Sequence, residues 1–261
     1  MFSGVMTDAW LAGTVVALVG GVVGFFVVLR GATFAAHAIP LSAFAGAAGA
    51  ALLGVSTLAG LGAVAPVAAL SIGWLSRRRR SDVVTALVVA AMLGLGSLFL
   101  SWTAEYGSEI YALLFGEILG VTPADVWVTA VLGAAALVVV TALYRPLLLS
   151  SVTPDVAEAR GVRPLLVDGA FLLLVAAVTA TAVPVVGALL MFALMVGPAA
   201  AARTFVASPF RAMVLAGALA LATVWASIAA SYLTNWPIGF FVGVLGGGWF
   251  VLARTWAARH R

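Results

Sequence analysis

The sequence predicts an all-α membrane protein: one bundle of about nine transmembrane helices, with its N-terminus outside and its C-terminus in the cytoplasm. Three observations support this prediction, namely the composition, a series of long uncharged stretches, and the placement of the arginines. Hydrophobic residues make up 64% of the 261 residues, and charged residues only 8%. A soluble domain carries about 45–50% apolar and about 25% charged residues. So few charges cannot cover a water-facing surface, which excludes a soluble globular protein and a disordered chain.

Nine stretches of the chain approach or reach the length of about 20 apolar residues that crosses a bilayer as a helix. Proline lies in or at the ends of three of them, at Pro66, Pro184 and Pro198, and often marks a broken or re-entrant helix, so eight to ten crossings are possible. No basic residue precedes the first stretch, so we expect a retained span and not a cleaved signal peptide. The expected spans are residues 9–29, 38–56, 58–75, 83–102, 126–144, 165–183, 184–202, 212–233 and 236–253.

Residues 103–124 do not fit this series. An apolar run at 110–115 is framed by Glu105, Glu109 and Glu117. We expect a short helix here that lies at one surface or dips back into the membrane.

The basic residues indicate the orientation. All 13 are arginines, and nine crossings place every one of them on the same side. The positive-inside rule makes that side the cytoplasm of a plasma membrane. The opposite side receives only acidic residues, so the basic net charge is a topology signal and no nucleic-acid partner is expected. The four arginines at 77–80 can also contact anionic lipid.

One cytoplasmic segment, residues 145–164, is long enough to hold structure of its own. Thr153 can cap a helix that has Pro154 at its first position. Asp155 in the first turn suits the helix dipole, and Gly161 can end the helix. The segment is either a plain capped loop or a helix on which a cytoplasmic partner docks.

Ionisable residues within the spans are few, and such residues are functional candidates. His37, near the start of the second span, is either a transition-metal ligand or a hydrogen-bonded interfacial residue. Asp168, near the cytoplasmic end of the sixth span, is expected to snorkel or to cap. The sequence contains no lysine and therefore no nucleotide-binding P-loop, and no H-E-x-x-H or G-x-S-x-G motif. No enzymatic constellation is evident.

Five segments contain recognisable motifs, and they follow one another along nearly the whole chain. They read VVGFFVVLRGATFAAHAIPLSAFAGAAGAALLG (22–54), ALLFGEILGVTPADV (112–126), SVTPDVAEARGV (151–162), VVGALLMFALMVGPAAAA (185–202) and SYLTNWPIGFFVGVL (231–245). Together they resemble the integral membrane permeases of ABC importers for zinc, manganese and iron. The residues on which the family pattern falls are His37, Ala38, Pro154, Ala157, Gly161, Gly187, Pro198, Pro237 and Gly239.

The resemblance implies the many-helix fold of type II ABC importers, formed here by one transmembrane domain over residues 1–261. It implies two copies around a central pathway, two cytoplasmic ATP-binding subunits and an extracellular solute-binding protein. ATP would bind the partner subunits, and this chain would hold no cofactor and catalyse no reaction. Residues 150–164 would be the coupling segment seated in the ATPase, through Thr153, Pro154, Asp155, Ala157, Glu158 and Gly161. His37 would line the pathway of a metal ion, and Gly187 and Pro198 belong to a structural motif of that pathway.

One departure from the family pattern concerns the cargo. The family commonly has Asp four residues before the histidine, one helical turn away on the same face. An Asp and His pair suits manganese or zinc, but this chain has Thr33 there, which is a poor metal ligand. A complexed metal or a non-metal solute is therefore an alternative cargo. A secondary transporter and a membrane scaffold that binds no solute are the alternatives to an ABC permease.

Overall fold

The computed structural model describes residues 5–75, 81–102, 114–116 and 118–259. Within these residues the secondary structure is entirely helical, and nine helices are long and apolar enough to cross a membrane. The predicted number of spans is confirmed. The long helices are α1 (Val5–Leu29), α2 (Thr33–Leu53), α3 (Thr57–Leu75), α4 (Ser81–Leu100), α6 (Pro123–Ala142), α9 (Pro164–Val186), α10 (Ala188–Phe205), α11 (Pro209–Thr234) and α12 (Ile238–Arg259).

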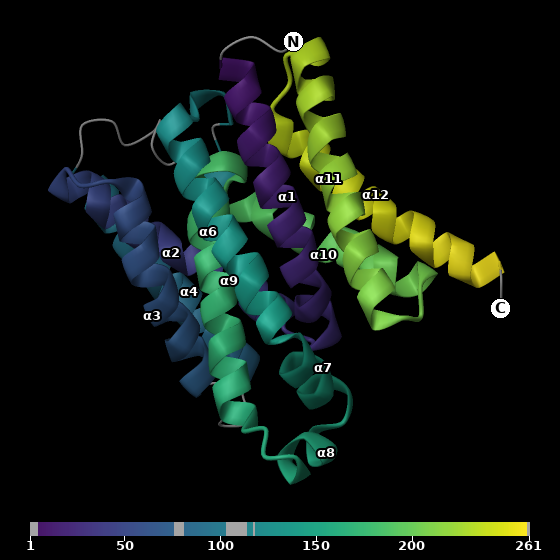
Figure 1. The fold of residues 1–261 in the computed structure, drawn as a ribbon. Coiled ribbons are helices and arrows are strands. Elements are labelled where there is room, and N and C mark those ends of the chain that lie inside the picture. The colour runs from purple at the N-terminus through teal and green to yellow at the C-terminus, as the bar shows by residue number, and fades with distance from the viewer. Residues whose placement is uncertain (1–4, 76–80, 103–113, 117, 260–261) are drawn as a thin grey trace.

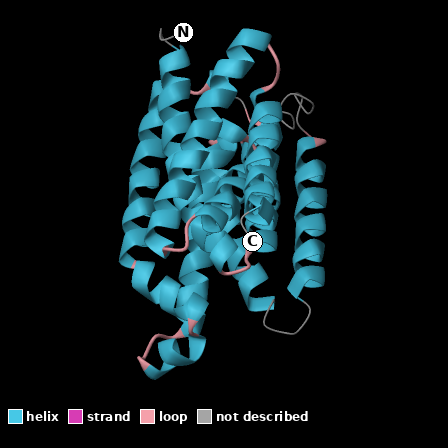
Figure 2. Cartoon of the chain, turned by 90° about the vertical axis from the view of Figure 1, so that its right-hand side faces the viewer, coloured by secondary structure: helices cyan, strands magenta, loops and turns pink. Residues whose placement is uncertain are grey.

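Three shorter helices complete the described fold: the 3₁₀ turn η1 (Ile118–Gly120), α7 (Tyr144–Val152) and α8 (Pro154–Ala159). Figure 1 shows α7 and α8 together at the end of the bundle opposite the N-terminus. In the view of Figure 2 most of the long helices run side by side. The coupling segment predicted from sequence is therefore a separate helical unit at one end.

The interior is formed by α1, α2 and α9. In their most apolar stretches 67% of the residues of α1, 72% of α2 and 67% of α9 are buried, against only 17% in α4 and 22% in α6. α1 packs against α6, α9, α10 and α11. The outer helices expose large apolar side chains, including Leu87 of α4 and Val131 of α6. Apolar side chains on the outside of such a bundle suit contact with lipid.

The boundary between the sixth and seventh spans differs from the sequence prediction. A break was expected between residues 183 and 184 because of Pro184, but α9 continues through this proline and ends at Val186. Gly187 forms the break, with φ 90° and ψ 152°, a backbone conformation that is essentially restricted to glycine. Proline removes one hydrogen-bond donor from a helix, which neighbouring helices can tolerate in a membrane bundle, whereas the turn needs glycine. Pro66 and Pro198 also lie inside continuous helices.

The start of the second span was also predicted too late. α2 begins at Thr33 and not at residue 38, so His37 lies inside the helix. A helix can begin with polar residues such as Thr33 when the chain has just turned. The turn here is Arg30–Ala32, with Gly31 at φ 65°.

Most of the ambiguous region 103–124 lies outside the described residues, including Glu105, Glu109 and Glu117. The described part packs into the bundle: η1 contacts α1 and α9, and Ile118 is buried. Gly116 lies directly on the α9–α10 break, where a Cβ atom on Gly116 would come within 2.6 Å of the Gly187 nitrogen. The two glycines thus allow these two pieces of backbone to touch.

Candidate transport pathway and coupling segment

His37 lies one helical turn after Thr33 on α2, and both side chains are partly buried. The imidazole packs edge-on against the ring of Phe192 in α10, with centroids 4.9 Å apart and planes at 67°. Its Nδ1 atom is buried and has no hydrogen-bond partner within the described part of the chain. Within the described residues Nδ1 therefore makes no hydrogen bond, which makes it a candidate ligand atom.

A single copy of the chain does not supply a complete metal site among the residues that the structure describes. No group of three or more His, Cys, Asp or Glu side chains converges there. Divalent transition metals in proteins usually have four or more ligands. If His37 binds a metal, the remaining ligands must come from outside this set, such as a second copy or the solute itself.

A cavity of about 760 Å³ opens at the end of the bundle where α1 begins, between Phe115, Gly116 and Ile118 on one side and the α11–α12 connection on the other. Its lining includes Met6, Ile118, Tyr232 and Trp236 and contains no His, Asp or Glu among the described residues. His37 does not line it. The described part of its lining is therefore mainly apolar and aromatic and contributes no histidine or carboxylate as a metal ligand.

Gly187 and Pro198 both act on helix packing. Gly187 forms the α9–α10 turn on which Gly116 lies. Pro198 is buried within α10, and a Cβ atom on its neighbour Gly197 would come 2.7 Å from the carbonyl carbon of Gly246 in α12. Gly187 thus precedes α10 and Pro198 lies within it, and Phe192 of the same helix contacts His37.

The predicted coupling segment has the expected limits. Thr153 is the N-cap residue of α8 and Pro154 its first residue, with Asp155 in the first turn. Gly161 has φ 77° and ends the helical region, and the N–H of Val162 donates to the Ala157 carbonyl at 3.0 Å. One detail of the prediction is wrong: the Thr153 side chain accepts no capping hydrogen bond. Its hydroxyl instead donates to the Leu149 carbonyl at 3.4 Å, so it closes the end of α7.

The two faces of α8 differ in exposure. Ala157 is completely buried, and α8 contacts α7 and α9. Asp155, Val156 and Glu158 are exposed, Val156 to 43%. Any partner that docks on α8 would therefore meet these exposed residues, and Ala157 would hold the helix against its own chain.

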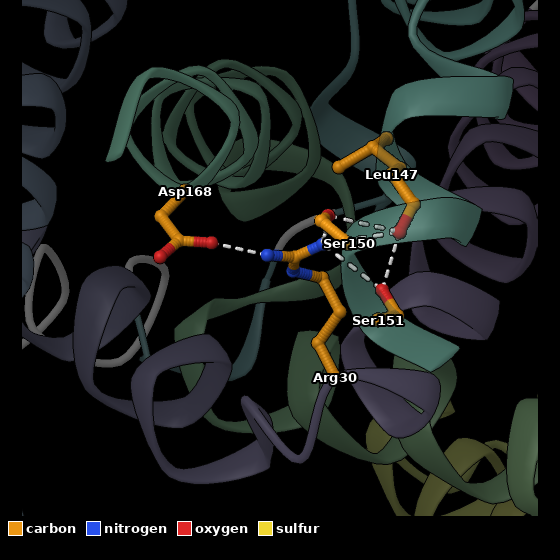
Figure 3. A network of polar contacts seen from close by, with 5 residues as sticks. All are labelled: Arg30, Leu147, Ser150, Ser151 and Asp168. Atoms are coloured by element: carbon orange, nitrogen blue, oxygen red, sulfur yellow. Dashed lines mark hydrogen bonds and ion pairs between the residues drawn. The ribbon is translucent and has the colours of Figure 1, made fainter. Parts of the chain in front are cut away.

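Arg30 forms a polar network that sequence reasoning did not find (Figure 3). Its guanidinium donates to the Leu147 carbonyl at 3.2 Å and to the hydroxyls of Ser150 and Ser151 at 2.9 Å each. It also forms an ion pair with Asp168. Asp168 had been expected to snorkel or cap, but α9 has no side-chain cap and Asp168 pairs with Arg30. The sequence did contain a signal for this pair, because Arg30 and Asp168 carry opposite charges at the cytoplasmic ends of two predicted spans. Arg30 was, however, interpreted only as a marker of topology.

The fold and the site together define an integral membrane protein with a helical bundle and a short helical unit at one end. The profile of the ABC 3 transport family matches residues 3–256. This chain therefore belongs to the ABC 3 transport family.

Several relatives and solved structures are similar over most of the chain. The manganese transport system membrane protein MntC of Listeria monocytogenes is 29% identical over 90% of this chain and 84% of its own length. The manganese import system permease protein ScaB of Streptococcus parasanguinis is 27% identical, over 98% of this chain and 92% of its own length. A chain of PsaBC from Streptococcus pneumoniae, solved in complex with Fab, matches with a TM-score of 0.88 and 25% identity, covering 96% of this chain and 91% of its own.

Proposed function

We propose that this chain is the membrane permease subunit of an ATP-driven importer in the plasma membrane, with a divalent transition metal as cargo and manganese as the first candidate. Two copies would surround the pathway, two cytoplasmic ATPases would bind ATP, and an extracellular solute-binding protein would deliver the cargo. Residues 1–261 would form one transmembrane domain with the coupling segment 150–164. The chain itself would hold no cofactor and catalyse no reaction.

The observation that carries this proposal is the position of α8. It is a short helix with an exposed polar edge, and it lies beyond the long helices at the end opposite the N-terminus (Figure 1). With the N-terminus outside, that end faces the cytoplasm, where an ATPase would dock. ATP-driven closure of the ATPase pair would move α8, and the two bundles would open alternately to either side. Relatives named as manganese permeases support the same assignment.

The proposed cargo site rests on His37. Its buried Nδ1 has no hydrogen-bond partner among the residues that the structure describes and would be available as a ligand, and a second copy would contribute a second imidazole. Imidazole binds manganese, iron and zinc, so His37 alone does not select among them.

A second candidate cargo follows from Thr33. Because this residue supplies no carboxylate one turn before His37, a metal that arrives with its own chelating ligands suits the site, and so does a non-metal solute. The fold is the same in either case.

Two measurements test the proposal. Uptake of manganese, zinc and iron is followed in cells that express the chain with its ATPase, for the wild type and His37→Ala. We expect uptake of one metal, lost in the variant. Equal uptake of a metal by the wild type and by His37→Ala would contradict the ligand role of His37. Absence of uptake of all three metals would favour the second candidate cargo.

The ATPase contact is tested by co-purification from membranes. We expect Val156→Asp to reduce the ATPase recovered with the chain, because it places a charge on the exposed apolar part of α8. Ala207→Asp is the matched control, at an exposed residue in the α10–α11 connection on the same side by the predicted topology. If no ATPase co-purifies with the wild-type chain, a secondary transporter or a scaffold becomes the better interpretation.

A further inference from the structure

Arg30 is a nearly buried cation at the place where the end of α1 meets α7 and α9. Its side chain is only 10% exposed, and it lies just after the last residue of α1. A buried charge is tolerated only where it is paired and hydrogen-bonded. Arg30 meets this condition: its Nη1 atom donates to acceptors on α7, its Nη2 atom pairs with Asp168 of α9, and its Cζ lies 5.3 Å from the centroid of Phe171 in α9.

The partners of Arg30 lie on both sides of α8 along the chain. α7, which carries Leu147, Ser150 and Ser151, leads directly into α8, and α9, which carries Asp168, follows it after four residues. The Arg30 guanidinium therefore links two helices to the end of α1: α7, which precedes α8 in the chain, and α9, which follows it. α2 begins three residues after Arg30, with His37 one turn further on.

We infer that Arg30 is a positioning residue that holds the coupling helix α8 in register with the transmembrane helices, so that movement of α8 is passed to α1, α9 and the start of α2. The coupling part of this inference rests on the proposed function. The anchoring part rests only on the network in Figure 3.

Arginine suits this role because its planar fork can donate to several acceptors at once. A lysine ammonium keeps the charge but cannot span the α7 hydroxyls and the Asp168 carboxylate in the same way. Asp168 is 55% exposed, so water can solvate its carboxylate when Arg30 is removed. Loss of Arg30 should therefore release α7 and α8 without leaving a second charge buried.

Hydrogen exchange of the full-length chain in lipid nanodiscs tests the anchoring. In Arg30→Met we expect amide exchange over residues 144–163 to rise about tenfold by local opening, while exchange over α11 stays at the wild-type level. Arg30→Lys should give an intermediate effect. The matched control is Arg203→Met: Arg203 also contacts the end of α1, by donating to the Val28 carbonyl at 3.0 Å, but it has no contact with α7 that the structure records.

Unchanged exchange over residues 144–163 in Arg30→Met would overturn the anchoring, and so would an equal rise over α11, which would indicate general destabilisation. Should Arg30→Met fail to fold, Asp168→Asn provides the test. It removes the ion pair with α9 and leaves the Phe171 contact and the α7 hydrogen bonds in place, so we expect a smaller rise in exchange confined to residues 153–163. No change there would overturn the role of the ion pair.

The coupling part is tested in the assembled complex by manganese transported per ATP hydrolysed. We expect this ratio to fall about tenfold in Arg30→Met, within the usual range of coupling between distant sites, and to stay at the wild-type value in Arg203→Met. Increased exchange with an unchanged ratio would overturn the transmission of motion. A wild-type complex without ATP-driven transport would refute the proposed function, whereas the exchange data would still decide whether Arg30 anchors α8.

Discussion

Replacing Gly187 by alanine should destabilise the bundle strongly, because this residue meets two separate requirements. Its backbone has φ 90° and ψ 152°, and a residue with a Cβ atom in such a sparsely populated region costs about 1–3 kcal/mol. The added methyl group would also lie 2.5 Å from the Gly116 nitrogen and 2.5 Å from the Leu114 carbonyl oxygen. Carbon atoms in contact normally stay about 3.5–4.0 Å apart.

The two contributions together predict a loss of about 4 kcal/mol. Overpacking alone typically costs about 1–3 kcal/mol, and here the atoms that would be struck belong to the backbone and cannot rotate away. The methyl group would have to push the backbone around Gly116 off the α9–α10 turn by about 1 Å. We therefore expect the change to loosen residues 114–116 as well as to reduce the free energy of unfolding.

Gly169→Ala is the matched control for this prediction. Gly169 lies within α9, the helix that ends just before Gly187, and a Cβ atom there would meet nothing within 4 Å. Because alanine is favoured over glycine inside a helix by about 1 kcal/mol, this variant should be as stable as the wild type or slightly more stable. The assay is reversible unfolding in mixed micelles by added SDS. The reasoning is refuted if Gly187→Ala unfolds at the same SDS fraction as Gly169→Ala.

Two further predictions concern the cargo and the coupling segment. Thr33→Asp supplies a carboxylate one turn before His37, so the KM for manganese uptake should fall about tenfold if the ion passes this face of α2; an unchanged KM would place the ion elsewhere. Ala157→Arg places a large charged side chain in the buried contact of α8, so it should raise proteolysis of the α7–α9 connection and abolish transport-coupled ATP hydrolysis while the long helices stay folded. Normal coupled hydrolysis in a variant with normal protease resistance would count against the packing seen at Ala157.

Much of the fold could be predicted because its signals are local. A span is recognised from some 20 consecutive residues, and the lipid environment requires such a segment to be helical. The limits of α8 were predicted from Thr153, Pro154 and Gly161 because turns and caps depend on adjacent residues. The capping hydrogen bond of Thr153 was not correctly predicted, because its hydroxyl had a competing acceptor in Leu149, four residues earlier.

Three features that sequence reasoning missed have a common cause, since each depends on residues far apart in the chain. The α9–α10 break falls at Gly187 and not at Pro184 because residues 114–116 pack onto it. The pairing of Arg30 with Asp168 joins residues 138 positions apart, and a span-by-span reading treats each charge only as a marker of sidedness. The burial of Ala157 likewise depends on how α8 packs against α7 and α9.

By itself, then, the sequence determined the class of protein, the number of spans, the limits of α8 and the family resemblance. These features depend on composition and on short runs of residues. The hydrophobic length of a span and the residues that cap a helix are local properties that do not depend on how the helices pack. Only the tertiary structure decided that His37 packs on Phe192 with an unpartnered nitrogen, and that Arg30 fastens α7 and α9 to the end of α1. Such contacts arise when helices distant in sequence pack side by side, because packing brings together side chains whose separation along the chain is too large for any local pattern to record.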